Sequence, residues 1–127
     1  MARQLVNVLG VGIDSVTMQQ AVAIVDGFVR TRKPALVATA NAEMVMLAQQ
    51  DQELFAILNA AELVLADGAG VVWAARRLAT GVPERVAGYD LTQELLQHAA
   101  TTGYTVFWLG AAPGVAATAA AKAARCY

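Results

Sequence analysis

Short apolar runs alternate with helix-like segments along this chain of 127 residues, and this alternation constrains the fold more than any other feature. The runs are Leu5 to Ile13, Ala35 to Ala40, Leu63 to Ala66 and Thr105 to Leu109. The last three are almost uninterrupted, which is typical of strands covered on both faces. Strands of this kind belong mainly to parallel sheets, because the connecting helices lie on the two faces.

The segments between the runs have apolar residues at helical spacing. They are Val16–Arg32, with Thr17 as a possible N-cap, Asn41–Asn59, Gly70–Ala79, Leu91–Thr101 and Gly114–Ala124. The second of these could break near Gln50 and Asp51. The pattern predicts a single α/β domain over residues 1–127, with a Rossmann-like, mainly parallel sheet and helices on both faces.

Composition limits the classes of function. Hydrophobic residues make up 57% of the chain and charged residues 15%, which excludes a disordered protein. Nine basic residues against ten acidic ones give a net charge of −1 without a basic run, so we expect no nucleic-acid partner. A single cysteine, Cys126, and a single histidine, His98, predict neither a disulfide framework nor a metal site.

The chain carries no recognisable secretion signal, because Asp14 follows the first apolar run early and no small-residue cleavage site comes after it. We therefore expect a cytoplasmic protein. Residues Leu95 to Ala121 lack charged side chains but include Gly103, Gly110 and Pro113. We interpret this stretch as a helix end, a buried strand, a glycine turn and another helix, and not as a membrane span.

Polar and glycine-rich segments follow three of the predicted strands. They are Thr39–Glu43, Asp67–Val71 and Gly110–Gly114. Ligands of open α/β sheets bind at the carboxyl ends of the strands, so these segments are expected to meet at one edge.

Asp67 is the strongest candidate for a catalytic residue. Gly68 and Gly70 follow it, and the absence of Cβ atoms there would leave a ligand room beside backbone N–H groups. An aspartate in this setting suits a general base. The alternative is structural, since Asp67 could simply cap the helix that begins near Gly70.

Further candidates have equally plain structural alternatives. Thr39 and Asn41 could hold sugar or phosphate oxygens, or they could be a strand residue and a helix cap. Arg85 could bind a phosphate, or it could form a solvated ion pair with Glu84 or Asp90. His98 lies beside an apolar helical stripe, which favours a structural role.

Gly10 and Gly12 loosely resemble a dinucleotide-binding glycine motif. The match is weak because Ser15 occupies the motif's sixth position and no acidic residue ends the second predicted strand. A Rossmann-like nucleotide-binding module built on this turn remains the alternative to an enzyme.

Four segments in order resemble one family. They are Thr39–Glu43, Leu65–Val72, Pro83–Leu91 and Phe107–Ala116, and they look like the successive signatures of the WecG/TagA/CpsF glycosyltransferases. The resemblance covers the chain from about Val6 onward.

The resemblance implies a bacterial, inverting transferase that needs no metal or cofactor. Such enzymes move N-acetylmannosamine or a related sugar from UDP to a polyprenyl-diphosphate-linked GlcNAc, for teichoic acid, exopolysaccharide or other cell-wall synthesis. It implies that Asp67 is the catalytic base, that Thr39, Asn41, Gly68 and Gly70 line the substrate pocket, and that Arg85 faces an anionic part of the substrates.

Family members run to about twice this length, so the resemblance also implies that the chain corresponds to an N-terminal half. The other half is expected to carry a donor-site motif and a basic tail that holds the protein peripherally at the inner face of the cytoplasmic membrane. We therefore also considered a catalytically inert fragment that could form homo-oligomers through an uncovered apolar face.

Overall fold

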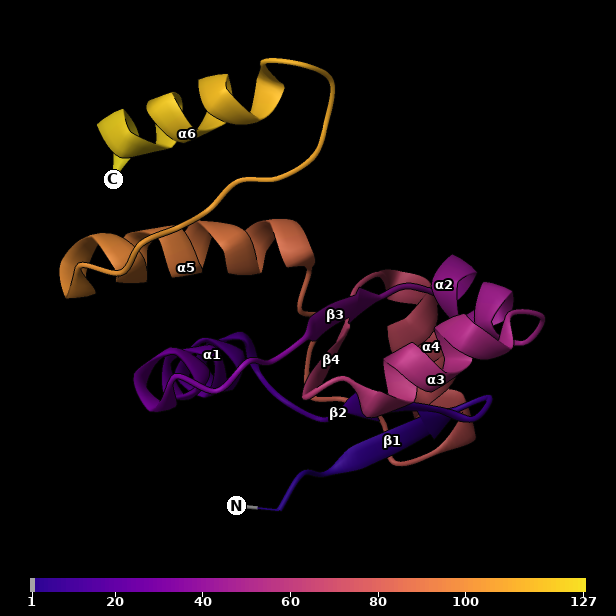
Figure 1. Ribbon diagram of the computed structural model, residues 1–127. Coiled ribbons are helices and arrows are strands. Elements are labelled where there is room, and N and C mark those ends of the chain that lie inside the picture. The colour runs from indigo at the N-terminus through magenta and orange to yellow at the C-terminus, as the bar shows by residue number, and fades with distance from the viewer. Residues whose placement is uncertain (1) are drawn as a thin grey trace. The chain divides into compact units, whose positions relative to one another are not determined.

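The computed structural model describes residues 2–127, which divide into two compact units between Leu91 and Thr92 (Figure 1). The unit that ends at Leu91 contains every strand found in the described residues. The combination of helices and strands confirms the predicted α/β class. Within the described residues, the strands form two two-stranded sheets, one antiparallel and one parallel.

The first predicted strand is in fact a hairpin. β1 (Leu5–Val8) and β2 (Val11–Asp14) pair antiparallel around the two-residue turn Leu9–Gly10. Both turn residues have positive φ, 51° and 86°, which matches the twist of the strands that they join. A Cβ on Gly10 would lie 2.9 Å from the ring of Phe55, so packing as well as backbone conformation requires glycine. The local period of the apolar residues could not reveal this reversal.

Three helices follow in the first unit and confirm the predicted caps and break. α1 (Met18–Thr31) begins with a capping box in which Thr17 and Gln20 exchange hydrogen bonds. The predicted second helix is divided into α2 (Ala42–Ala48) and α3 (Gln52–Ala60). The side chains of Asn41 and Asp51 cap them, so the division falls where a new N-terminus finds its own acceptor.

β3 (Val37–Ala40) and β4 (Leu63–Ala66) pair in parallel, with Thr39 opposite Leu65 and Ala40 opposite Ala66. α2 and α3 form the connection between them, as a parallel pair requires. All four residues of β4 are buried, which explains its uninterrupted apolar sequence.

An ion pair with a buried carboxylate joins the two sheets. Asp14, at the end of β2, is only 3% exposed and receives two hydrogen bonds from Arg3, at 3.0 and 2.7 Å. It also accepts the N–H of Val64 in β4 at 2.7 Å, while Arg3 reaches the carbonyl of Ala61. The hydrogen bond from Arg3 to Asp14 raises the pKa of the guanidinium above its usual value. The pair therefore fixes β2 against β4 where no strand ladder joins them.

α4 (Ala69–Leu78) follows β4 and buries Val71, Val72 and Ala75 against the core. α5 (Gly88–Thr102) begins in the first unit, where Leu91 is buried. Val86, in the connection between them, donates a backbone hydrogen bond to Ala66 at 2.9 Å. This bond brings the start of α5 to the carboxyl end of β4.

The second unit contains most of α5, an irregular segment and α6 (Val115–Cys126). The predicted strand Thr105–Leu109 is wrong, because these residues form no strand ladder. Phe107 and Leu109 are 86% and 90% exposed. A β-branched, aromatic segment becomes a strand only when a neighbouring backbone pairs with it, and no described residue does so here.

Within residues 2–127, no helix combines the length and the apolar character needed to cross a membrane.

Candidate functional site

The candidate site lies at the carboxyl edge of the parallel pair, where two of the three predicted segments, Thr39–Glu43 and Asp67–Val71, come together. The third, Gly110–Gly114, follows none of the strands in the described residues and belongs to the second unit. Thr39 is the penultimate residue of β3, and Asp67 directly follows β4. The N–H of Asp67 donates to the carbonyl of Ala40, the last residue of β3, at 2.9 Å, which continues the parallel pairing one residue beyond β4. The backbone therefore holds Asp67 beside the end of β3.

The side chain of Asp67 does not cap the helix that follows it. α4 begins after Gly68, which has φ 118° and provides no side-chain cap. Instead, Oδ2 of Asp67 accepts the N–H of Gly88, the first residue of α5, at 3.1 Å. The structural alternative predicted for Asp67 is therefore wrong, and the carboxylate is directed to a second helix N-terminus.

Close approaches between small groups bring the other candidates to the same edge. A Cβ built on Gly88 would lie 2.8 Å from Cγ2 of Thr39, and one on Gly68 would lie 3.9 Å from Cβ of Asn41. A Cβ on Gly70 would meet that of Ala42 at 3.2 Å. We name Thr39, Asn41, Asp67, Gly68, Gly70 and Gly88 the edge cluster.

Asn41 serves as the N-cap of α2, which was its predicted structural alternative. Its Oδ1 accepts the N–H of Met44 at 2.8 Å, and the residue is exposed. This bond uses the carbonyl oxygen and not the amide nitrogen, which is a donor. Capping and ligand binding are therefore compatible at this position.

Arg85 forms an ion pair outside the edge cluster. Its guanidinium lies 3.8 Å from the carboxylate of Asp90, and both side chains are more than half exposed. This is the solvated ion pair predicted as its structural alternative. Arg85 is adjacent to Val86, which is bonded to the end of β4, but the structure records no contact between its guanidinium and the edge cluster.

The contacts that Gly88 and Glu84 make here were not predicted from the sequence, in which Glu84 was considered only as an ion-pair partner of Arg85. Gly88 supplies the N–H that Asp67 binds, and Glu84 binds the N–H of Met18 at 2.8 Å. A glycine immediately before a helical pattern was a usable signal for a close backbone approach at Gly88. Nothing in the local sequence could reveal the partner of Glu84, because Met18 is 66 residues away.

The glycine motif at Gly10 and Gly12 does not form a dinucleotide-binding turn. Such a turn joins a strand to a helix, whereas Gly10 turns one strand into the next and Gly12 lies inside β2. Asn59 bonds both glycines through their backbones, at 3.0 Å each. These glycines accommodate α3 against the hairpin, and the nucleotide-binding module predicted from this motif is not supported.

His98 and the acidic residues give no sign of other chemistry. The ring of His98 is half-buried and makes an edge contact with Tyr104, with a centroid distance of 5.9 Å, as expected for a structural histidine. Across residues 2–127, no group of three His, Cys, Asp or Glu side chains gathers in a way that could hold a metal ion.

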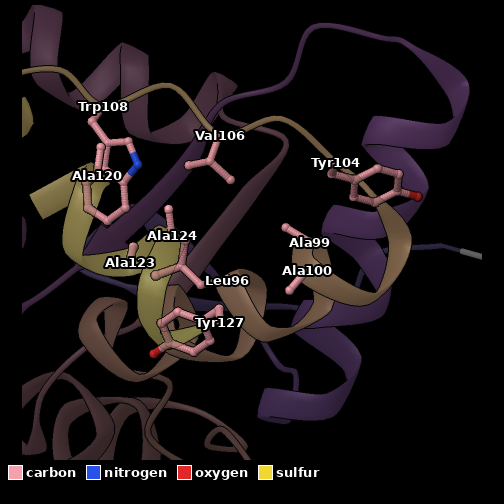
Figure 2. A pocket seen from close by; sticks show the side chains of 10 residues that line it. All are labelled: Leu96, Ala99, Ala100, Tyr104, Val106, Trp108, Ala120, Ala123, Ala124 and Tyr127. Carbon is pink, nitrogen blue, oxygen red and sulfur yellow. The ribbon is translucent and has the colours of Figure 1, made fainter.

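The second unit contains a hollow of about 380 Å³ between α5 and α6 (Figure 2). Its lining is mostly apolar, with Leu96, Val106 and three alanines of α6, and with Trp108 and Tyr127 at its sides. Tyr127 donates a hydrogen bond to Gln93. No charged side chain lines the hollow, whereas the edge cluster contains the carboxylate of Asp67.

Comparison with known proteins agrees with the motifs at the sheet edge. The sequence profile of the glycosyl transferase WecG/TagA/CpsF family matches residues 6–127. Among curated proteins, the chain is similar to the N-acetylglucosaminyldiphosphoundecaprenol N-acetyl-beta-D-mannosaminyltransferases of Staphylococcus aureus strains NCTC 8325 / PS 47, COL and MSSA476. It is 36% identical to each over 108 residues, which are 84% of this chain and 42% of the relative.

The chain thus spans less than half the length of these relatives. The matched family region nevertheless includes the whole edge cluster and Arg85. The chain belongs to the WecG/TagA/CpsF glycosyltransferase family.

Proposed function

We propose that this chain provides the acceptor-activating part of an inverting glycosyltransferase. The donor would be UDP-N-acetylmannosamine or a related UDP-sugar, and the acceptor would be a polyprenyl-diphosphate-linked GlcNAc, the chemistry named for the relatives. The observation that carries the proposal is the position of Asp67, a half-buried carboxylate at the sheet edge, bonded to the N-terminus of α5.

In the proposed reaction, Asp67 removes the proton from the acceptor hydroxyl. The hydroxyl oxygen attacks the anomeric carbon, the bond from that carbon to the UDP oxygen breaks, and UDP leaves with the electron pair. The bond to Gly88 occupies Oδ2, so Oδ1 is the oxygen directed to the hydroxyl. Because attack comes from the face opposite UDP, the anomeric configuration inverts.

The other members of the edge cluster would hold the sugars. Thr39 offers a hydroxyl and Asn41 an amide, while Gly68 and Gly70 leave backbone groups accessible at the start of α4. Arg85 would leave Asp90 to bind a diphosphate, because a phosphate accepts two parallel hydrogen bonds from guanidinium. The pair is solvated and its charged groups are 3.8 Å apart, so breaking it costs little free energy.

Two further parts of the proposal concern the fold of the protein and its location. We infer that the β3–β4 pair with its helical connection belongs to a Rossmann-like parallel sheet, because such a crossover is the repeating unit of that fold. A lipid-linked acceptor would keep the reaction at a membrane surface, with the protein peripheral at the cytoplasmic face.

The test is sugar transfer from UDP-N-acetylmannosamine to a polyprenyl-diphosphate-GlcNAc analogue, with the wild type compared with Asp67→Asn. The amide keeps the size of the side chain but removes the base, so turnover should fall by about 10²- to 10⁴-fold. Asp51→Asn is the matched control: Asn also caps a helix, and Asp51 caps α3 outside the edge cluster.

Undiminished turnover in Asp67→Asn would overturn the assignment of the base. Titration with UDP, NAD and NADP separates the rival class of function. Binding of a dinucleotide without a response to UDP would contradict the transferase proposal and favour a nucleotide-binding module.

A further inference from the structure

The segment Glu84–Gly88, which ends at the first residue of α5, is attached to other parts of the first unit by three hydrogen bonds. Glu84 accepts the N–H of Met18 through Oε1 at 2.8 Å. Val86 donates its N–H to the carbonyl of Ala66 at 2.9 Å, and Gly88 donates to Asp67 at 3.1 Å. The bonds of Val86 and Gly88 attach the segment to the end of β4, and the bond of Glu84 attaches it to the start of α1.

The attachment through Glu84 satisfies a group that α1 cannot satisfy itself. Met18 is the first residue of α1, so its N–H has no carbonyl partner within the helix. The capping box uses the N–H groups of Thr17 and Gln20. A carboxylate at the N–H of Met18 therefore adds a third acceptor, and its negative charge is favourable at a helix N-terminus.

Arg85 lies between two of these attachments. Glu84 fixes the segment on one side of it, and Val86, which is 1% exposed, fixes the segment on the other. The side chain of Arg85 is 54% exposed, and the interaction found for it among residues 2–127 is the long ion pair to Asp90. Its position therefore depends on the backbone, because its own contacts are too weak to fix it.

We propose that Glu84 is a positioning residue. Its hydrogen bond to Met18 fixes the segment that carries Arg85 and that presents the N–H of Gly88 to Asp67. The consequence for catalysis rests on the function proposed above, whereas the structural attachment does not. Glu84 acts through these neighbours and makes no contact with the reacting atoms.

The first experiment measures amide hydrogen exchange in the full chain. Glu84→Ala removes the acceptor, so the amide of Met18 should exchange about tenfold faster, as loss of roughly 1.4 kcal/mol of local protection implies. Glu84→Gln keeps a side-chain oxygen and should remain within about threefold of the wild type. The amide resonance of Gly88 should shift in Glu84→Ala and stay close to its wild-type position in Glu84→Gln.

The second experiment measures transfer kinetics with the same variants. Glu84→Ala should raise KM for the diphosphate-linked acceptor by about tenfold and leave kcat within about threefold, because ground-state binding by Arg85 is lost while Asp67 remains. Glu84→Gln should restore KM. Glu53→Ala is the matched control, since Glu53 is an exposed acid in the first turn of α3 and should change neither measurement.

Unchanged exchange at Met18 in Glu84→Ala would overturn the proposal, as would faster exchange with an unchanged KM. If the wild type transfers no sugar, the proposed function fails. The exchange and resonance measurements then still decide whether Glu84 fixes the segment.

Discussion

The carboxylate of Asp67 accepts the backbone N–H of Gly88 at 3.1 Å, across 21 residues of sequence. This one bond connects the end of β4 to the beginning of α5 and gives the proposed base a fixed orientation. Gly88 can approach so closely because it has no Cβ. Thr39 occupies the space where that atom would be.

Gly88→Ala should therefore destabilise the protein. The new Cβ would lie 2.8 Å from Cγ2 of Thr39, and overpacking of this kind costs about 1–3 kcal/mol. Removing Cγ2 with Thr39→Ser in the same chain should recover part of the loss. Urea unfolding of the two single variants and the double variant measures this coupling.

Gly27→Ala provides the control, because nothing lies within 4 Å of a Cβ at this position inside α1. It should stabilise the chain by about 0.5–1 kcal/mol. Equal effects of the substitutions at Gly27 and Gly88 would contradict the contact with Thr39.

The two roles of Asn41 should separate by substitution. Asn41→Ala removes the acceptor for Met44 and should cost about 0.5–2 kcal/mol of stability. Asn41→Asp keeps a capping oxygen and should preserve the free energy of unfolding, but it replaces the amide donor with a charge that repels a diphosphate. Thermal unfolding and sugar transfer would be measured on both. Full transfer by Asn41→Asp would limit Asn41 to capping.

Arg85→Gln should affect substrate binding far more than stability. The ion pair with Asp90 is half-exposed, so its loss should change the free energy of unfolding by less than about 1 kcal/mol. Loss of a bidentate phosphate contact should weaken binding of the diphosphate-linked acceptor by about tenfold or more. Isothermal titration gives the affinity. Arg77→Gln, on the exposed face of α4, is the control and should bind normally.

The pair of Arg3 and Asp14 should show strong coupling. Arg3→Ala leaves a buried carboxylate without its cation and should cost about 1–3 kcal/mol, because Arg3 itself is 40% exposed and solvent screens the pair. Adding Asp14→Ala removes the stranded charge, so the double variant should lose less than the sum of the two single variants. Denaturant unfolding tests this against Arg30→Ala, which breaks an i,i+4 pair with Asp26 worth about 0.5 kcal/mol, in which the arginine is 68% exposed. Additive losses would show that the two side chains act independently.

Glu62 should titrate below its ordinary value. Its Oε2 accepts the N–H of Leu36 at 2.6 Å, and this hydrogen bond to the charged form lowers the pKa of the carboxyl. Because the folded pKa is the lower one, the contribution of Glu62 to stability is fully present above its unfolded pKa. It is lost as the pH falls through the folded pKa. Carbon-detected NMR titration of the folded chain and of the urea-unfolded chain compares the two values directly, and identical values would contradict the bond.

Several features followed from the sequence because they depend on neighbouring residues. The α/β class came from the alternation of apolar runs and helical segments, and the caps at Thr17 and Asn41 came from side chains that reach N–H groups three residues away. The position of Asp67 after a buried strand was equally local. Short-range hydrogen bonds and residue periodicity depend on residues that are close in sequence, so they can be predicted from the sequence alone.

Only the tertiary structure decided which distant groups meet. It showed that Asp67 binds Gly88 instead of capping α4 and that Glu84 reaches Met18. It also left Thr105–Leu109 without a paired neighbour, although the composition of that segment favours a strand. These outcomes depend on which backbone groups come within hydrogen-bonding distance across 20 or more residues, and residue order alone does not encode that distance.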